Sequence, residues 1–272
     1  MLHVRRFSRW FVILISAVTL AAIGTVVPHP ARGATLLWSD EFTGPSGASP
    51  ASSKWNWETG GGGWGNNEWQ TYTSSRSNSY LDGNGRLVIA ARGDTTGITS
   101  ARMNTFGKFS LTFGTVSTRI KLPAGQGLLP AFWLMGTDIY SAGWPKSGEI
   151  DVIEAPDNAL RYNTTVHGPT TSGGHWQRGV SGSLGVDLAA GYHVYSVTKS
   201  RGRLVMKIDD RTVATFTSSQ LSSGQQWVFD KPTYVLFTLA VGGNWPGAPD
   251  ATTPQPVVPA GRLDPGLQFV TA

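Results

Sequence analysis

The sequence has no cysteine and is poor in charged residues. None of its 272 residues is cysteine, and Asp, Glu, Lys and Arg together account for 14% of the chain. A disulfide framework is therefore excluded, and the fold has to be held by its hydrophobic core. A chain of this length can bury about 70 to 75% of its unfolded surface as one domain, so it needs no covalent staples. The spacings typical of zinc sites and of phosphate-binding glycine loops are also absent.

The sequence has a single long apolar run, WFVILISAVTLAAIG, at residues 10–24. Three arginines precede it, and the small residues of Ala31-Arg32-Gly33 follow it. This pattern predicts an export signal, residues 1–33, that is removed to leave a secreted, extracellular domain of residues 34–272. The alternative, a retained anchoring helix, is disfavoured because the run is short for a membrane span. Arg5-Arg6 is only loosely similar to a twin-arginine signal, so the export route stays open.

Little positive charge remains in the predicted mature domain. Removing residues 1–33 removes four arginines and no acidic residue, which lowers the formal net charge from +5 to +1. The basic excess typical of nucleic-acid-binding proteins is therefore absent. We expect no nucleic-acid partner, no membrane association after cleavage, and a monomer.

Helical periodicity is almost absent after residue 33, and β-strand patterns take its place. Runs of branched and aromatic residues alternate with Gly, Asn, Asp and Pro, as in residues 86–92, 108–122, 162–168, 193–200 and 233–243. Many strands without intervening helices predict an all-β fold of antiparallel sheets, either a sandwich or a barrel. Within residues 108–122 the apolar phase changes at Gly114, which predicts a bulge or a sharp bend there.

The segment GEIDVIEA, residues 148–155, concentrates three acids among branched aliphatic residues. Glu149 and Asp151 are two residues apart and share one face of a strand, whereas Glu154 would point to the other face. One extra residue in a bulge near Val152 or Ile153 would bring all three acids to the same face.

Aligned carboxylates of this kind suit glycoside hydrolysis. A retaining glycosidase needs two carboxyl groups about 5 to 5.5 Å apart, and the long Glu side chains can lean toward each other to reach that separation. The alternative is a solvated strand face, which is common on half-buried sheets. Like charges along one face repel each other, however, and Asp and Glu form strands poorly, so a functional site is favoured.

These residues also carry a family resemblance. GEIDVIE is similar to the active-site strand of family 16 of the glycoside hydrolases, in the bulged form typical of bacterial laminarinases; the unbulged form marks mixed-linkage lichenases. Further segments follow the family's order across residues 37–254, among them WSDEFTG, WGNNEWQTYT, DGNGRLVIAAR, PAFWLMG, TTVHGPTTSGG and LAVGGNWPGAPDATTP. The resemblance implies a β-jelly-roll sandwich of two antiparallel sheets with a sugar cleft on its concave sheet.

The resemblance implies a retaining endo-β-1,3-glucanase that acts on laminarin-type glucans and needs no cofactor for its chemistry. Glu149 matches the nucleophile, Glu154 the general acid/base, and Asp151 the acid between them. Three alternatives stay open: a mixed-linkage β-1,3-1,4-glucanase, a transglycosylase, and a β-glucan-binding, lectin-like module without catalysis, because a shared fold does not decide function.

Six further residues are candidates for sugar binding. Trp133, Trp144 and Trp245 match cleft positions of the family, and flat aromatic faces suit sugar rings, although most tryptophans serve packing. Asn67 falls where the family contacts a glucose hydroxyl and equally suits turn chemistry. Arg102 and His167 resemble cleft residues, and a lone histidine is often structural.

The C-terminus departs from the family, which closes on a strand similar to VDYVRVY. Here the chain ends VVPAGRLDPGLQFVTA, and Pro265-Gly266 would interrupt such a strand. We therefore expect the residues after Pro256 to pair poorly and the protein to lose stability. The family resemblance also implies a structural calcium at Glu41, Gly83 and Asp264, which needs six to eight oxygen ligands and which the altered end would weaken.

Overall fold

The computed structural model describes residues 35–94, 97–253 and 262–271, the last range by its backbone alone. The predicted signal peptide lies outside these residues and stays a prediction. Within the described ranges, every helix is too short or too polar to cross a membrane. The described part of the chain contains two short helical segments, α1 (Ile139–Ala142) and the 3-10 turn η1 (Ser218–Gln220).

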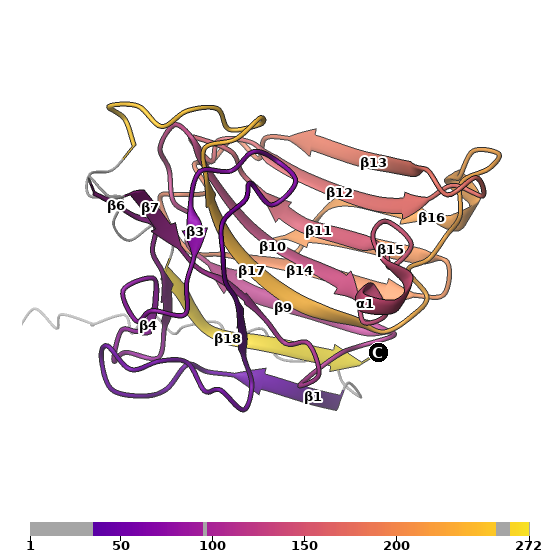
Figure 1. Cartoon of the computed structure of the whole chain (residues 1–272). Helices are drawn as coiled ribbons and strands as arrows, with labels where there is room; N and C mark the ends of the chain where they lie inside the picture. The colour runs from indigo at the N-terminus through magenta and orange to yellow at the C-terminus, as the bar shows by residue number, and fades with distance from the viewer. Residues whose placement is uncertain (1–34, 95–96, 254–261, 272) are drawn as a thin grey trace, which may run out of the picture.

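Two large antiparallel sheets lie face to face, as Figure 1 shows. The eight-stranded sheet contains β1 (Thr35–Asp40), β4 (Ser79–Leu81), β5 (Leu87–Ile89), β9 (Gly114–Ile120), β14 (His193–Ser200), β15 (Arg203–Ile208), β16 (Arg211–Thr217) and β18 (Arg262–Thr271). The seven-stranded sheet has the order β13 (His175–Gly182), β12 (Tyr162–Pro169), β11 (Glu149–Glu154), β10 (Leu128–Gly136), β17 (Thr233–Val241), β8 (Arg102–Asn104) and β2 (Asn56–Glu58). A small third sheet holds β3 (Thr71–Tyr72), β7 (Gly97–Ser100) and β6 (Arg92–Asp94). The predicted all-β, jelly-roll-like sandwich is confirmed.

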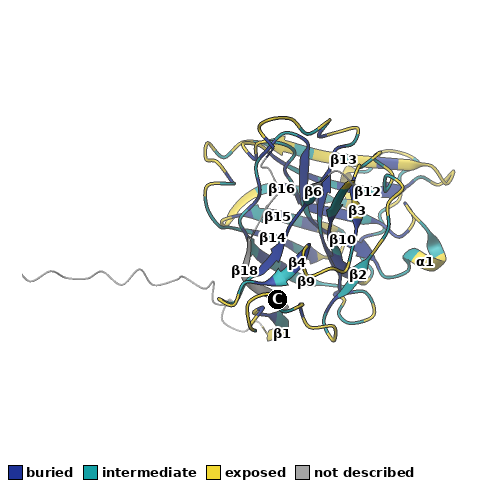
Figure 2. Ribbon diagram, turned by 60° about the vertical axis from the view of Figure 1, so that its left-hand side comes forward, coloured by how far each residue is buried: buried dark blue, intermediate teal, exposed yellow. Residues whose placement is uncertain are grey.

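The hydrophobic core fills the space between the two sheets. β9 alternates strictly between buried and half-buried residues, as expected for a strand with one face in the core. The aromatic rings of Trp55, Phe132 and Phe237 meet there, with centroids 5.4 to 5.5 Å apart. Figure 2 shows buried residues on the strands inside the sandwich and exposed residues along β13, which forms an edge of the seven-stranded sheet. This core holds the outer face of the seven-stranded sheet in a fixed shape.

The phase change predicted at Gly114 is the point where the chain passes between the sheets. Leu111 forms an isolated bridge with Thr233 of the seven-stranded sheet, whereas β9 begins at Gly114 in the other sheet. Gly114 has a φ of 128°, a conformation that side chains rarely adopt. Leu111 and Val116 both reach the core, so the bend lets both halves of the segment bury their apolar residues.

The prediction that the C-terminal segment pairs poorly is wrong. β18 lies between β1 and β9 and also pairs with β5. The register with β9 shifts between Asp264 and Gln268, so Pro265-Gly266 falls in an irregular stretch and the strand resumes beyond it. Because the bulge takes up the proline, which has no N–H to donate, the rest of β18 keeps its pairing. Residues 254–261 lie outside the described part of the chain.

Candidate active site

The predicted bulge is present on β11. Trp133 of β10 faces Asp151 and the preceding Phe132 faces Ile153, so Val152 is an extra residue on that side. The register with β12 shifts over the same stretch, between Asp151 and Glu154. Ile150, Val152 and Ile153 are fully buried in the core. The bulge therefore corrects the strand parity, as the spacing of the three acids predicted.

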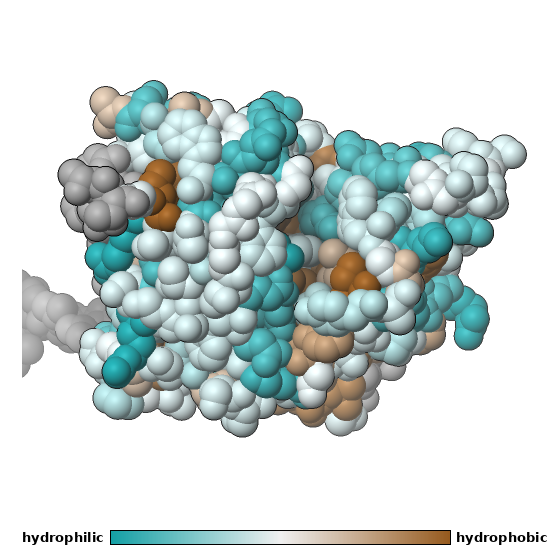
Figure 3. All heavy atoms as spheres, viewed as in Figure 1, coloured by the Kyte–Doolittle hydropathy of each residue, from teal (hydrophilic) through white to brown (hydrophobic). Residues whose placement is uncertain are grey.

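Cross-strand register places all three acids on the outer face of the sheet. In β10, Met135 faces Glu149, Trp133 faces Asp151 and Ala131 faces Glu154. Residues that face each other across paired strands share one side of a sheet. This outer face has its own apolar cluster, separate from the main core, made of Trp133, Met135, Tyr234 and Leu236 with Phe106, Ala131 and Ile139 packed against it. Figure 3 shows this side of the molecule hollowed, with apolar atoms visible inside the depression.

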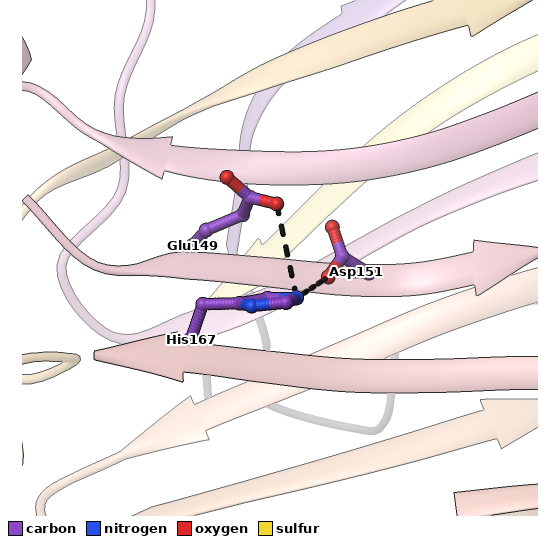
Figure 4. A group of neighbouring side chains, drawn as sticks. All are labelled: Glu149, Asp151 and His167. Atoms are coloured by element: carbon purple, nitrogen blue, oxygen red, sulfur yellow. Dashed lines mark ion pairs between the residues drawn. The ribbon is translucent and has the colours of Figure 1, made fainter. Parts of the chain in front are cut away.

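Two of the acids have neighbours that orient them. The indole Nε1 of Trp144 donates a hydrogen bond to Glu149 Oε2 at 3.0 Å. On β12, His167 Nε2 lies 3.0 Å from Asp151 Oδ2 and 3.9 Å from Glu149 Oε1. Figure 4 shows Glu149 and Asp151 on one strand, with the His167 ring reaching them from the next strand. The register explains this meeting, because His167 faces Glu149 directly in the β11–β12 pair.

Burial and mutual repulsion set the charges of the acids. Burial raises the pKa of Asp151 well above the ordinary value, and the charge of Glu149 and a hydrogen bond with it add to the rise. Burial likewise raises the pKa of Glu154 well above its ordinary value, with further contributions from Asp151 and Glu149. A carboxyl group of this kind keeps its proton at a pH where ordinary glutamates have lost theirs. The site can therefore hold a proton donor beside an ionised carboxylate.

His167 is kept neutral, because burial lowers its pKa more than the nearby Glu149 charge raises it. Among the described residues, Glu149, Asp151 and His167 are the one group of three acidic or histidine side chains whose ligand atoms all lie within 4.8 Å of one another. His167 Nε2 lies 3.0 Å from Asp151 Oδ2, close enough for an ion pair whenever the imidazole is protonated. Asp151 Oδ2 is buried and has no hydrogen-bond partner among the described residues. We interpret the group as an acid–imidazole contact within the candidate site.

Arg102 lies beside the acids on the same outer face. Its guanidinium pairs with Glu58 of β2 and lies 4.6 Å from the ring centroid of Trp133 and 4.8 Å from that of Trp64. Glu58 also accepts a hydrogen bond from Asn104 at 2.6 Å. This arrangement fixes Arg102 between two indole rings, with its remaining N–H groups available as donors.

Asn67 and Trp245 lie in two loops that contact each other. Asn67 has a φ of 54° and donates a hydrogen bond to Asn244 Oδ1 at 3.0 Å, while Asn244 N binds Asn66 O at 2.8 Å. Turn chemistry therefore accounts for Asn67, and its sugar contact stays a prediction. Trp245 is 46% exposed, so its ring is available for stacking, which also stays a prediction.

Five residues of the outer face were not singled out from the sequence. Glu58 belongs to a strand of three residues that has no period to recognise. Phe106 contacts Tyr140 and Tyr234 edge-on, and Tyr140, on α1, is 76% exposed. His175 begins β13. What these five residues share in the sequence is an aromatic or polar side chain close to a strand end. Such residues are frequent near loops, so this pattern alone is weak evidence for a functional site.

The predicted calcium site is described only in part. Glu41 is exposed, and desolvation followed by the Asp40 charge raises its pKa. Neighbouring Asp40 accepts hydrogen bonds from Phe42 N and Trp55 Nε1 and pairs with Lys54. The Asp264 side chain lies outside what the structure describes. The calcium site stays a prediction, and an ammonium group near Glu41 does not favour a cation there.

A bulged strand with three acids on the outer face of a β-sandwich, flanked by tryptophans, is the arrangement expected of a retaining glycoside hydrolase. The family model for glycosyl hydrolases family 16 matches residues 65–257. The chain belongs to this family of retaining hydrolases, whose chemistry requires no cofactor.

Individual relatives agree with the family. Glucan endo-1,3-beta-glucosidase A1 of Niallia circulans is 36% identical over 257 residues, covering 83% of this chain and 36% of the relative. The chain thus spans about a third of that protein. The beta-glucanase of Rhodothermus marinus is 37% identical over 226 residues, covering 78% of this chain and 77% of the relative. The laminarinase catalytic domain from Thermotoga maritima superposes with a TM-score of 0.77 at 34% identity, covering 88% of this chain and 98% of that domain.

Proposed function

We propose that the protein is a secreted endo-β-1,3-glucanase that hydrolyses internal β-1,3 bonds of laminarin-type glucans with retention of configuration. The observation that carries the proposal is the bulged strand β11, which presents Glu149, Asp151 and Glu154 on one face. Two of the relatives, a glucan endo-1,3-beta-glucosidase and a laminarinase, support the β-1,3 linkage, and the N-terminal sequence supports export.

Glu149 acts as the nucleophile and Glu154 as the general acid and base. Trp144 holds Glu149 by a hydrogen bond from its indole N–H. Glu154, with its raised pKa, donates a proton to the leaving glycosidic oxygen while Glu149 attacks the anomeric carbon. The bond to the leaving sugar breaks as the glycosyl–Glu149 ester forms. Glu154, now ionised, then takes a proton from the water that cleaves the ester, which regenerates both acids.

Asp151 modulates the charge of both glutamates. It is 3% exposed and lies between them on the strand. Burial raises its pKa, the charge of Glu149 and a hydrogen bond with it add to the rise, and His167 Nε2 lies 3.0 Å from Asp151 Oδ2. The protonation of Asp151 and of Glu154 therefore depends on the charges of the neighbouring acids.

Trp133 supports sugar binding at the centre of the site. Trp133 is 7% exposed, and its Nε1 has no hydrogen-bond partner among the described residues. A buried indole donor without a partner carries a free-energy penalty that a sugar hydroxyl can relieve. The exposed ring of Trp144 offers a flat surface for a glucose unit.

The test is to incubate purified protein with laminarin, with mixed-linkage lichenan and with cellulose, and to measure the reducing ends released. We expect release from laminarin to exceed that from the other two. Equal or faster release from lichenan would make the protein a mixed-linkage glucanase. Release from cellulose alone would overturn the β-1,3 assignment, and glucan binding without any release would indicate a lectin-like module.

Two further experiments test the stereochemistry of cleavage and whether water or a second sugar accepts the glycosyl group. Proton NMR of the first products should show the β-anomer before mutarotation, because two displacements retain configuration. Products longer than the starting oligosaccharide, formed at high oligosaccharide concentration, would indicate a transglycosylase.

A further inference from the structure

His175 lies where it can act on the proposed catalytic acids without touching them. In the β12–β13 register, His167 faces Gln177 and Pro169 faces His175, so His175 is the diagonal neighbour of His167. Residues 175 and 177 share one face of β13, because side chains alternate along a strand. That face is the outer one, since the intervening Trp176 is buried in the core.

Two contacts connect His175 to the site. Its Nε2 lies 2.9 Å from His167 Nδ1, and the two imidazole rings are nearly parallel, with centroids 5.1 Å apart and planes inclined by 12°. Its ring centroid is also 4.5 Å from that of Trp144. His167 Nε2 lies 3.0 Å from Asp151 Oδ2, and Trp144 Nε1 donates a hydrogen bond to Glu149. His175 therefore touches both partners of the acid pair.

The hydrogen-bond geometry makes the tautomers of the two histidines interdependent. A nitrogen–nitrogen contact of 2.9 Å requires one N–H and one bare nitrogen. If His167 Nδ1 accepts from His175 Nε2–H, the proton of the neutral His167 ring is on Nε2 and faces Asp151. If His167 Nδ1–H donates to His175 Nε2, His167 presents a bare Nε2 to Asp151 instead. Without His175, His167 loses the partner that fixes its second nitrogen.

We propose that His175 is a positioning residue, which fixes the tautomer and ring orientation of His167 beside Asp151 and supports Trp144 beside Glu149. The inference rests on the proposed catalytic roles of these acids. It requires two parts of His175. The ring nitrogen hydrogen-bonds His167, which lies beside Asp151, and the ring packs against Trp144, which hydrogen-bonds Glu149. His175 is exposed on the strand, so it can be replaced without disturbing the core.

Two substitutions separate the two contributions. His175→Phe keeps a flat ring against Trp144 and removes the nitrogen, whereas His175→Gln keeps a hydrogen-bonding group and removes the ring. We expect His175→Phe to lower kcat on laminarin about tenfold or more with KM changed less than about twofold, because small displacements of catalytic groups have large effects on rate. His175→Gln should keep kcat within about threefold and raise KM. His193→Phe is the matched control, since His193 pairs with Asp209 in the opposite sheet.

The second readout is independent of activity. Long-range proton–nitrogen NMR of histidine-labelled protein at pH 8 reports which ring nitrogen of His167 carries the proton. We expect one fixed tautomer in the wild type and in His175→Gln, and mixed tautomers in His175→Phe. Wild-type rates and an unchanged His167 tautomer in His175→Phe would overturn the inference. If the wild type has no glucanase activity, the proposed function fails, and the NMR comparison still decides whether His175 sets the His167 tautomer.

Discussion

The indole Nε1 of Trp144 donates a hydrogen bond to Oε2 of Glu149 at 3.0 Å. Trp144 is 49% exposed, so one half-exposed ring both orients the proposed nucleophile and offers a face to sugar. This relationship couples binding to chemistry, since a glucose unit stacked on the ring would sit next to the carboxylate that attacks it. Loss of the nucleophile itself should therefore leave binding intact.

Glu149→Gln should lower the rate on laminarin about a thousandfold or more, because an amide cannot form the glycosyl ester. Reducing-end release measures the rate. Laminarin affinity by isothermal calorimetry and the melting temperature should stay near those of the wild type. Activity above a few per cent, in a preparation shown by mass spectrometry to carry the substitution, would exclude Glu149 as the nucleophile.

Glu154→Ala should be slow on polymer and be partly rescued by azide on an aryl glycoside with a good leaving group. Such a leaving group departs without an acid, and the small anion attacks the glycosyl–Glu149 ester in place of activated water. NMR of the product should show a β-glycosyl azide. An α-azide would demonstrate inversion and contradict the mechanism.

Asp151→Asn should lower activity, shift the alkaline limb of the kcat/KM profile to lower pH, and stabilise the fold at pH 7. Burial and the charges of Asp151 and Glu149 raise the pKa of Glu154, so removing one charge lets Glu154 lose its proton at lower pH. A carboxyl whose folded pKa exceeds its unfolded pKa destabilises the fold as pH rises between the two values. An amide at position 151 avoids this penalty.

We expect a gain of about 1 kcal/mol in the free energy of unfolding, or about 2 to 4 °C in melting temperature, for Asp151→Asn. Thermal scans at pH 7 and pH 4 measure the effect, which should shrink at the lower pH. A loss of stability at pH 7 would show that the ionised Asp151 and His167 stabilise each other more than burial penalises the charge.

Lys199→Met should remove a pH dependence of stability. Lys199 is 1% exposed and donates to Thr233 Oγ1 at 2.7 Å and to Lys231 O at 3.0 Å. Burial lowers its pKa to about 7, partly offset by the Asp230 charge. The pKa of Lys199 is lower in the folded protein than in the unfolded chain. Carrying the proton therefore lowers the free energy of unfolding by the full penalty below pH 7, and this penalty disappears as the pH rises from about 7 to about 10.5.

Urea unfolding at pH 7 and pH 9.5 should therefore show wild-type stability rising relative to Lys199→Met, by at most about 1.4 kcal/mol per pH unit. Lys207→Met, at a half-exposed position of β15, is the control and should follow the wild type. Parallel pH dependence in the wild type and Lys199→Met would mean that the hydrogen bonds of Lys199 keep its pKa near the unfolded value.

Deleting residues 262–272 should destabilise the sandwich strongly. β18 pairs with β1 and β9, and its removal would leave β1 without the strand it pairs with and expose one edge of β9, which keeps only β14. We expect the melting temperature to fall by at least about 10 °C, which corresponds to several kcal/mol for a domain of this size. A fall of only a few degrees would show that the pairing of β18 contributes little to stability. The calcium prediction is tested separately, by comparing the melting temperature of the full chain in calcium with that in EDTA.

The local features of the site could be predicted from the sequence. Glu149, Asp151 and Glu154 have a spacing that only a bulged strand can reconcile with one face, and the register of β10 against β11 shows that bulge at Val152. Likewise the apolar phase change at Gly114 predicted a bend, and β9 begins there. Both inferences depend on the two-residue period of a strand, which covalent geometry imposes wherever the strand lies.

The partners of these residues could not be predicted in the same way. Glu58 meets Arg102 through pairing of β2 with β8, and His175 meets His167 through the register of β13 with β12. Pro265-Gly266 predicted that no closing strand would form, yet β18 pairs with β1 and with β9, and its register with β9 shifts at this dipeptide. Lys199 gave no sign in the sequence of being buried. The sequence by itself determined the strands, the bulge and the identity of the acids, because these follow from local geometry and side-chain chemistry. Which side chains surround the acids was decided only by the tertiary structure, since strand pairing joins residues far apart in the chain through the packing of the whole core.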